Sequence, residues 1–195
     1  MEDAILYDRL DKEVFVFGVF DGHGGAEVAQ YCASHIAVLI KENANYQQGD
    51  YGKALVEVFM KLDEMLDSAE GEKELRQITI DNGMQPFSEG KVADSVGCTA
   101  NVALISGNQI VVANTGDSRA ALSRNGKVIE LSKDHKPEDP LEESRIVAAG
   151  AKVEKGRINN HLNLSRCLGD LHYKRNKDLP PNKQAVIAEP DIKSV

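Results

Sequence analysis

Seven consecutive apolar residues, VFVFGVF at 14–20, are followed at once by DGHGG at 21–25. Valine and phenylalanine favour strands, and a run with no polar alternation predicts a strand buried on both faces. The glycines of the second segment end this strand, because glycine adopts turn conformations that other residues avoid. The junction therefore places Asp21 and His23 in a tight turn at the end of a buried strand.

Apolar side chains recur at helical spacing on two later segments, which predicts two helices with one apolar stripe each. The first stripe consists of Val28, Ala29, Cys32, Ile36, Leu39 and Ile40, and the second of Leu55, Val58, Phe59, Leu62, Met65, Leu66 and Ala69. Each helix should therefore cover a sheet from outside. A loop is expected between them at 43–52, and the polar segment 70–95, which contains Pro86, predicts a long surface loop.

The middle of the chain shows short strand patterns separated by turn residues. Residues 98–105 should pair with 109–114. Residues 118–123 should pair with 127–131 across an Asn-Gly dipeptide, which is typical of two-residue hairpins. These patterns predict an antiparallel meander.

A further helix is expected after Asp139, which can cap it, with Pro140 at the first helical position. Glu142 completes a capping box, and Gly150 marks the end of the helix. The remainder of the chain predicts short strands separated by a basic, proline-containing loop. The order of elements predicts a single α+β domain over residues 1–195, with helices packed outside stacked antiparallel sheets.

The charge balance limits the partners of such a chain. It carries 31 acidic and 23 basic residues, a net charge of -8, which repels nucleic acid and anionic membranes. Its longest apolar run is far shorter than a membrane span, and acidic residues stand where a signal peptide would be basic. The three cysteines are an odd number without paired spacing, which favours a reducing compartment. We therefore expect a monomer in the cytoplasm or nucleus that binds neither nucleic acid nor membrane.

Carboxylates at the ends of strand patterns are the candidates for chemistry. Asp21 follows the first strand, Asp117 lies in the turn NTGDSR and Asp170 ends LNLSRCLGD. Glu2 and Asp3 form an acidic pair at the chain start. Each has an ordinary alternative role, as a turn former, a helix cap or solvated surface. If the sheets stack, these oxygens could converge on one rim, where they would suit Mg²⁺ or Mn²⁺.

The neighbours of Asp21 favour the metal-binding interpretation. Gly22 leaves its own carbonyl unobstructed, so that side-chain and backbone oxygens could bind one hard cation together. His23 then stands beside this position as a candidate proton donor. An acidic protein that acts on phosphate needs such a cation, because the cation inverts the local field.

Several other chemistries lack their sequence patterns. The cysteines and histidines show no pair with zinc-ligand spacing, and the Walker motif, dinucleotide fingerprint and nucleophile elbow are missing. Cys167 is followed six residues later by Tyr173 where a cysteine-phosphatase loop requires arginine. Cys32 and Cys98 lie on apolar faces, which predicts core positions.

Ordered sequence blocks give the chain a family resemblance. They are FGVFDGHGG, SVGCTANVALI, VANTGDSRAAL, LSKDHKPEDPLEESRIVAAGAKV, RINNHLNLSRCLGD and EPDI. Together they cover nearly the whole chain, which closely resembles the metal-dependent protein serine/threonine phosphatases of the PP2C type. The resemblance implies a β-sandwich of two antiparallel sheets flanked by helices, with two metal ions in a cleft at one end.

The resemblance also implies roles for single residues. Asp21 would bridge both metals, the Gly22 carbonyl would bind one of them, and Glu2 would support that ion through its waters. Asp170 would bind the other ion, and Asp117 would share a third, weaker site with it. The ions would be Mg²⁺ or Mn²⁺.

The same resemblance implies the reaction. Water activated by two metal ions would hydrolyse phosphoserine or phosphothreonine in phosphorylated protein substrates, with Asp21 holding the ions and His23 protonating the leaving oxygen. Asp3 would have a supporting role. Residues 133–143 fall where the family carries a flap beside the cleft, and we expect substrate selection there.

The chain also departs from the family pattern. The family's phosphate-binding arginine would precede Glu2 by four residues, and its later Asp-Gly-x-Trp-Asp and Asp-Asn blocks are missing. The chain is therefore expected to be an incomplete domain with a weakened first metal site. Two alternatives stay open: a catalytically inactive phosphatase-like binding module, and a di-metal hydrolase of small phosphoesters.

Overall fold

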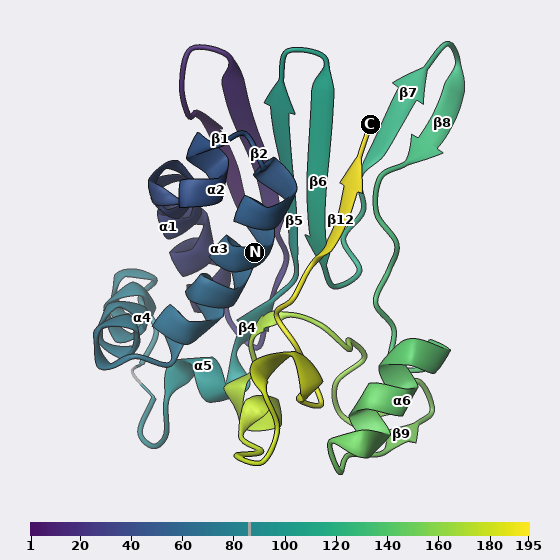
Figure 1. The fold of residues 1–195 in the computed structure, drawn as a ribbon. Coiled ribbons are helices and arrows are strands. Elements are labelled where there is room, and N and C mark those ends of the chain that lie inside the picture. The colour runs from purple at the N-terminus through teal and green to yellow at the C-terminus, as the bar shows by residue number, and fades with distance from the viewer. Residues whose placement is uncertain (86) are drawn as a thin grey trace.

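The computed structural model describes residues 1–85 and 87–195, and its largest element is a five-stranded antiparallel sheet (Figure 1). In spatial order its strands are β1 (Ala4–Arg9), β2 (Val14–Phe20), β5 (Ala100–Ser106), β6 (Gln109–Thr115) and β12 (Asp191–Ser194). The expected strand at 14–20 and the hairpin of β5 and β6 are confirmed. β12, from the end of the chain, pairs with β6 and forms one edge of the sheet.

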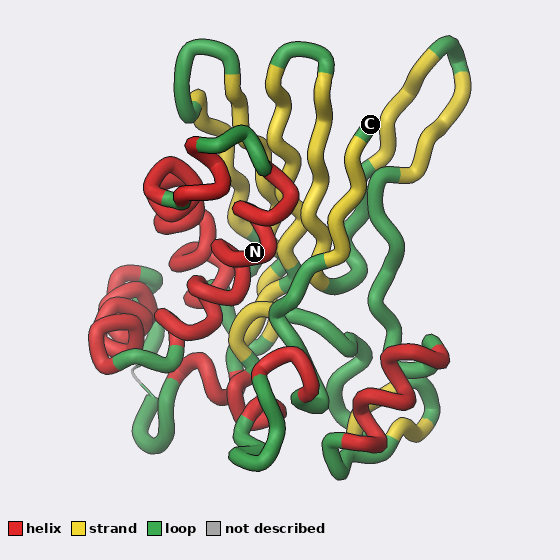
Figure 2. Tube along the Cα trace, viewed as in Figure 1, coloured by secondary structure: helices red, strands yellow, loops and turns green. Residues whose placement is uncertain are grey.

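Helices cover one face of this sheet. α1 (Glu27–Glu42) and α3 (Tyr51–Leu66) lie on it, and α2 (Ala44–Gln47) and α4 (Ala69–Asp81) pack beside them. α5 (Val92–Ser95) contacts α4 and β11 (Leu168–Gly169), and α6 (Pro140–Ala148) contacts β9 (Val153–Glu154), away from the main sheet. α1 packs on β1 and β2, α3 packs on β6 and β12, and α4 packs against α1 (Figures 1 and 2). The two expected apolar stripes make this interface, where Ile36, Leu55 and Phe59 are fully buried. The prediction that the helices cover a sheet is confirmed.

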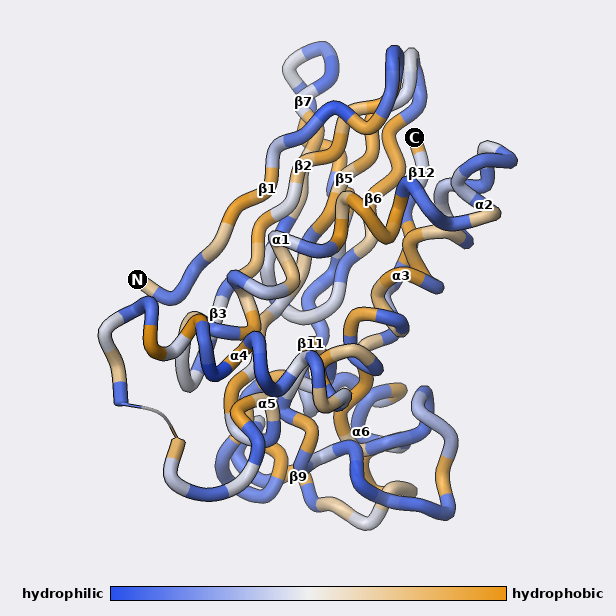
Figure 3. The backbone as a smooth tube through the Cα atoms, turned by 90° about the vertical axis from the view of Figure 1, so that its left-hand side faces the viewer, coloured by the Kyte–Doolittle hydropathy of each residue, from blue (hydrophilic) through white to orange (hydrophobic). Residues whose placement is uncertain are grey.

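The opposite face of β1 and β2 is exposed, so the expectation of a strand buried on both faces is wrong. Along β2 the inward residues are buried, whereas Phe17 is 40% and Val19 is 47% exposed. Their cross-strand partners Tyr7 and Ile5 are 71% and 80% exposed. The continuous apolar run thus comes from a buried inner face and an outer face that no described element covers. The apolar character of β2, β5 and β6 is visible in Figure 3.

Three smaller antiparallel units complete the described chain. β3 (Gly22–His23), β4 (Gly97–Cys98) and β11 (Leu168–Gly169) form a three-stranded sheet in the order β11-β4-β3. β7 (Ala121–Arg124) pairs with β8 (Lys127–Glu130), and β9 (Val153–Glu154) pairs with β10 (Arg157–Ile158). The Asn-Gly hairpin is confirmed, with both turn residues at positive φ. The two hairpins lie in separate sheets, so the middle of the chain is not one continuous meander.

Three local predictions are wrong. The segment 43–52, expected as a loop, contains the four-residue helix α2. The segment 70–95 contains α4 and α5 in place of a long loop, although Pro86 lies outside the described residues. The Ser68 side chain accepts a hydrogen bond from Gly71 N and starts α4, which needs only a narrow buried face because it lies at the periphery. At α6, Asp139 makes no side-chain cap among the described atoms, and its carboxylate pairs with Lys133. Glu142 binds Arg145 and Arg166 and does not turn back to the helix start, so the expected capping box does not form.

Within 1–85 and 87–195, every helix is too short or too polar to cross a bilayer.

Candidate metal centre

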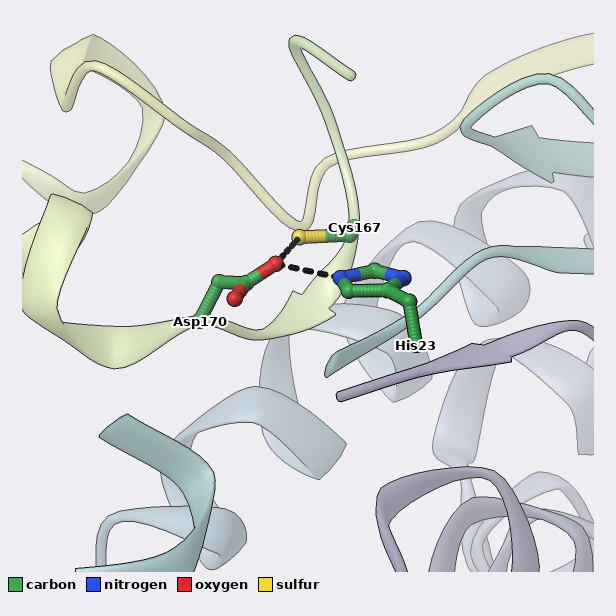
Figure 4. A group of neighbouring side chains, drawn as sticks. All are labelled: His23, Cys167 and Asp170. Atoms are coloured by element: carbon green, nitrogen blue, oxygen red, sulfur yellow. Dashed lines mark hydrogen bonds and ion pairs between the residues drawn. The ribbon is translucent and has the colours of Figure 1, made fainter. Parts of the chain in front are cut away.

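The three-stranded sheet brings together segments that are far apart in sequence. Its strands are two residues long: His23 of β3 lies opposite Gly97 of β4, which in turn lies opposite Gly169 of β11. Asp170 follows β11 directly, and its N–H donates to the carbonyl of Val96, 3.1 Å away. Short strand pairing therefore carries His23 and Asp170 to one point, as Figure 4 shows.

His23, Asp170 and Cys167 form one contact group (Figure 4). Nε2 of His23 lies 2.6 Å from Oδ2 of Asp170, and the Cys167 thiol donates to the same oxygen over 3.1 Å. The Asp170 side chain is 5% exposed, against 29% for His23. Burial alone would raise the pKa of Asp170, but the hydrogen bond and the charge of His23 hold it below its usual value. The carboxylate is therefore ionised and ready to bind cations.

Backbone conformation makes room for this group. A Cβ on Gly97 would lie 2.6 Å from Oδ2 of Asp170 and 2.7 Å from Nε2 of His23, so any larger residue would force these two side chains to shift. Gly169 and Asp170 both have positive φ, at 77° and 48°, which turns the chain sharply behind β11. Aspartate is among the few residues that adopt the left-handed region readily.

A second group of acids surrounds Asp21. The pairing of β1 with β2 aligns Ala4 with Phe20, which places Asp3 beside Asp21. Burial, followed by the charge of Asp3 and a hydrogen bond between the two carboxyls, raises the pKa of Asp21. The charge of Asp117 raises it further, whereas His23 opposes the shift. Three neighbouring carboxylates repel one another, and a bound cation would offset that repulsion. Such a cluster is therefore typical of a cation site.

Gly22 and Glu2 meet through their backbones at the same place. A Cβ on Gly22 would collide with the Glu2 carbonyl oxygen and would lie 2.9 Å from the Gly25 carbonyl oxygen. Backbone oxygens thus pack closely around this glycine, while the Glu2 side chain points into solvent. Carboxylates and carbonyl oxygens are the donors that Mg²⁺ and Mn²⁺ prefer, so this donor set fits the expected ions.

Asp117 is tied to the segment that the sequence suggested as a flap. Its carboxylate forms an ion pair with Lys136, and both side chains are partly buried. Below them, the buried ring of His135 accepts a hydrogen bond at Nδ1 from the Gly116 N–H, 3.1 Å away. This bond anchors the turn that carries Asp117.

The structure thus places the six site residues expected from sequence near one end of the main sheet, in two groups. Asp21 lies with Asp117 and the Gly22–Glu2 contact, and His23 lies with Asp170; among the described side chains these two groups share no common ligand cluster. Two participants were not indicated by sequence: Cys167 and Lys136. Asp3, which the resemblance gave a supporting role, lies beside Asp21.

The sequence matches the family model for Protein phosphatase 2C over residues 1–195. The chain belongs to the protein phosphatase 2C family. It is 47% identical to "Probable protein phosphatase 2C 2" of Paramecium tetraurelia, over 100% of this chain and 63% of that protein. It is 44% identical to "Probable protein phosphatase 2C 11" of Oryza sativa subsp. japonica, over 100% of this chain and 62% of that protein.

Solved structures show the same likeness. A phosphatase from a pathogenic strain of Toxoplasma gondii matches with a TM-score of 0.74 and 28% identity, over 99% of this chain and 67% of that one. The resemblance read from the sequence blocks is confirmed, and so is the fold class of antiparallel sheets flanked by helices. This protein phosphatase 2C chain spans about 63% of the length of the Paramecium relative.

Proposed function

We propose that the protein hydrolyses phosphoserine and phosphothreonine in phosphorylated proteins with the help of Mg²⁺ or Mn²⁺. The observation that carries the proposal is the closeness of Asp3 and Asp117 to Asp21, whose charges raise the pKa of Asp21, with His23 two residues along the chain. Membership of the protein phosphatase 2C family supports the reaction class.

The proposed roles in metal binding follow from where each residue lies. Asp21, with the Gly22 carbonyl, would hold the ions on one side, and Asp170 would hold them on the other. Glu2 and Asp117 would support them at the rim. When bound, such ions neutralise phosphoryl oxygens and lower the pKa of water.

His23 has the geometry of a proton donor. Its bond to the ionised Asp170 favours a proton on Nε2, and its partial exposure leaves the ring accessible to substrate. The leaving serine or threonine oxygen needs one proton as the P–O bond breaks, and His23 would supply it. Gly97 keeps the space beside Nε2 free of side chain.

Phosphate release from a phosphothreonine peptide tests the proposal. With millimolar Mn²⁺ we expect turnover that EDTA abolishes and that Asp21→Asn lowers by about 1,000-fold, since the metals supply several kcal/mol of stabilisation. The matched control is Asp178→Asn, the same substitution at an exposed acid, which should leave turnover unchanged.

Other outcomes would contradict the proposal. A folded chain that binds the phosphopeptide without releasing phosphate would be a binding module. Turnover of small phosphoesters but not of phosphopeptides would identify a different di-metal hydrolase. Equal turnover in Asp21→Asn and wild type would show that the acids around Asp21 are not the reaction centre.

A further inference from the structure

The group of His23, Cys167 and Asp170 has a donor chemistry that differs from the acids around Asp21. It offers one imidazole nitrogen, one sulfur and one carboxylate oxygen, and these atoms all lie within 4.8 Å of one another. Within the described residues it is the one group of three that meets this criterion. Mg²⁺ prefers six oxygens in an octahedron and is poorly served by such a set. Zn²⁺ prefers tetrahedral nitrogen, sulfur and oxygen ligands.

We propose that His23, Cys167 and Asp170 form a zinc site with three protein ligands and one open position. A zinc ion with bonds of about 2.0–2.3 Å holds neighbouring ligand atoms roughly 3.3–3.8 Å apart. The observed separations from Oδ2 of Asp170 are 2.6 Å to Nε2 of His23 and 3.1 Å to Sγ of Cys167. Nε2 and Oδ2 would therefore have to separate by at least about 0.7 Å, and Sγ and Oδ2 by a smaller distance. The third pair, Nε2 and Sγ, lies within 4.8 Å.

Charge balance favours a divalent cation here. On binding, the Cys167 thiol releases one proton to solvent, Nε2 of His23 loses the proton that it donates to Asp170 while Nδ1 carries one, and Asp170 is already anionic. Two negative ligands then compensate Zn²⁺, which leaves a neutral site suited to a buried place. The nearby charge of buried Lys174 is matched by its ion pair with Asp63, at 2.7 Å, so it does not repel the cation.

The surroundings allow access. The His23 side chain is 29% exposed, whereas Asp170 is 5% exposed and Cys167 is buried. An ion can thus reach Nε2 from solvent and then contact the deeper ligands. Because Gly97 has no side chain, the space beside Nε2 and Oδ2 is not filled by a Cβ. The open fourth position would hold water.

A zinc ion at this place would compete with the proposed reaction. It would occupy Asp170, an expected ligand of the hard cations, and His23, the expected proton donor. Zinc would therefore inhibit turnover, a consequence that rests on the proposed function. Zinc binding itself depends only on the three side chains, so the zinc site and the proposed function can be refuted separately.

Cobalt absorption of the full 195-residue chain tests the site without any assay of turnover. Co²⁺ bound to a thiolate absorbs in the near ultraviolet by charge transfer from sulfur. We expect this band to saturate at one equivalent of Co²⁺ and to vanish when Zn²⁺ displaces the cobalt. Cys167→Ala should abolish the band and weaken Zn²⁺ binding by more than the 10–100-fold that loss of a supporting residue causes. The matched control is Cys32→Ala, another fully buried thiol outside the group, which should keep both.

X-ray absorption of the zinc-loaded wild type gives a second readout that needs no variant. One sulfur at about 2.3 Å and one or more nitrogen or oxygen ligands at about 2.0–2.2 Å would support the site. A first shell without sulfur would overturn it. So would a charge-transfer band that survives in Cys167→Ala or disappears in Cys32→Ala. If the site forms and zinc leaves phosphopeptide turnover unchanged, the zinc site stands and the roles proposed for His23 and Asp170 in turnover have failed. Absence of phosphopeptide turnover without zinc would count against the proposed function and not against the zinc site.

Discussion

The main sheet and the three-stranded sheet are built in different ways. Strands of the main sheet are four to seven residues long, and their register is set by buried side chains from β2, β5 and the covering helices. The strands β3, β4 and β11 have two residues each, and their approach depends on glycines that leave room for backbone and ligands. Burial of apolar area therefore stabilises the first region, and the absence of side chains permits the second. Substitutions in the main sheet should therefore act by removing buried apolar area, and those in the three-stranded sheet by adding side-chain atoms where there is no room.

The largest effect should come from the core of the main sheet. Phe59 of α3 is fully buried, so Phe59→Ala should lower the free energy of unfolding by about 3–5 kcal/mol. Phe17→Ala on the exposed face of β2 is the matched control and should cost less than about 1.5 kcal/mol. Urea unfolding at equilibrium measures both. Equal costs would show that the two faces of the sheet do not differ as described.

An ion cluster joins α6 to the segment before β11, beside a small apolar cluster in which Ile146 of α6 packs with Cys167. Glu142 is buried between Arg145, at 2.7 Å, and Arg166, at 2.6 Å. Burial alone would raise the pKa of Glu142, but the two arginines lower it to about 2 from 4.5. Because the folded-state pKa is depressed, the stabilisation is complete above pH 4.5 and is lost as the pH falls towards 2.

The full contribution of this cluster is roughly 3 kcal/mol, of which roughly 2 kcal/mol should be lost by about pH 3. Glu142→Gln lacks the titrating group. The difference in unfolding free energy between wild type and Glu142→Gln, measured in urea at about pH 7 and about pH 3, should therefore shrink by that amount. A difference that stays constant with pH would show that the arginines do not stabilise the ionised carboxylate.

Substitutions in the three-stranded sheet should lower phosphopeptide turnover more than they lower the free energy of unfolding. Gly97→Ala would place a methyl group 2.6 Å from Oδ2 of Asp170 and must displace the group around His23. We expect phosphopeptide turnover to fall by about 100-fold, or about 2.7 kcal/mol. Gly52→Ala is the matched control, since its Cβ would meet only the Cγ2 methyl of Ile192 at 3.3 Å. Undiminished turnover in Gly97→Ala would refute the steric role assigned to this glycine.

The smallest effect concerns the ion pair at the rim. Lys136→Met removes the ammonium that neutralises Asp117, so Mn²⁺ should bind several-fold more tightly, while stability should change by less than about 1 kcal/mol. Lys133→Met is the control, because Lys133 pairs with Asp139, outside the acids around Asp21. Titration with Mn²⁺ distinguishes the two variants. Identical affinities would mean that Lys136 does not compete with cations at Asp117.

The elements that the sequence predicted correctly are those that local patterns determine. The strand at 14–20, the two apolar stripes and the Asn-Gly hairpin follow from local periodicity and turn chemistry, and they match the structure. α4 was missed because a peripheral helix needs few apolar residues. The exposed outer face of β2 was missed because a continuous apolar run does not say what covers it.

The candidate site shows a similar division. Asp21 and Asp170 could be selected because each follows an apolar strand pattern with a glycine beside it. The contact of His23 with Asp170 joins residues 147 positions apart and depends on the pairing of β3, β4 and β11. Cys167 was assigned no role because the spacing of residues along the chain does not show which distant residues strand pairing brings together. Long-range register, not residue type, was the missing information.

The left-handed backbone at Asp170 determines how this position can be probed. Alanine there would remove the carboxylate and also strain a φ of 48°, which residues other than glycine, asparagine and aspartate adopt with difficulty. Alanine scanning would thus confound lost ligation with a distorted turn. Asparagine keeps the shape and the tolerance for this conformation while removing the charge. At this residue, the choice of replacement decides whether an experiment measures chemistry or backbone geometry.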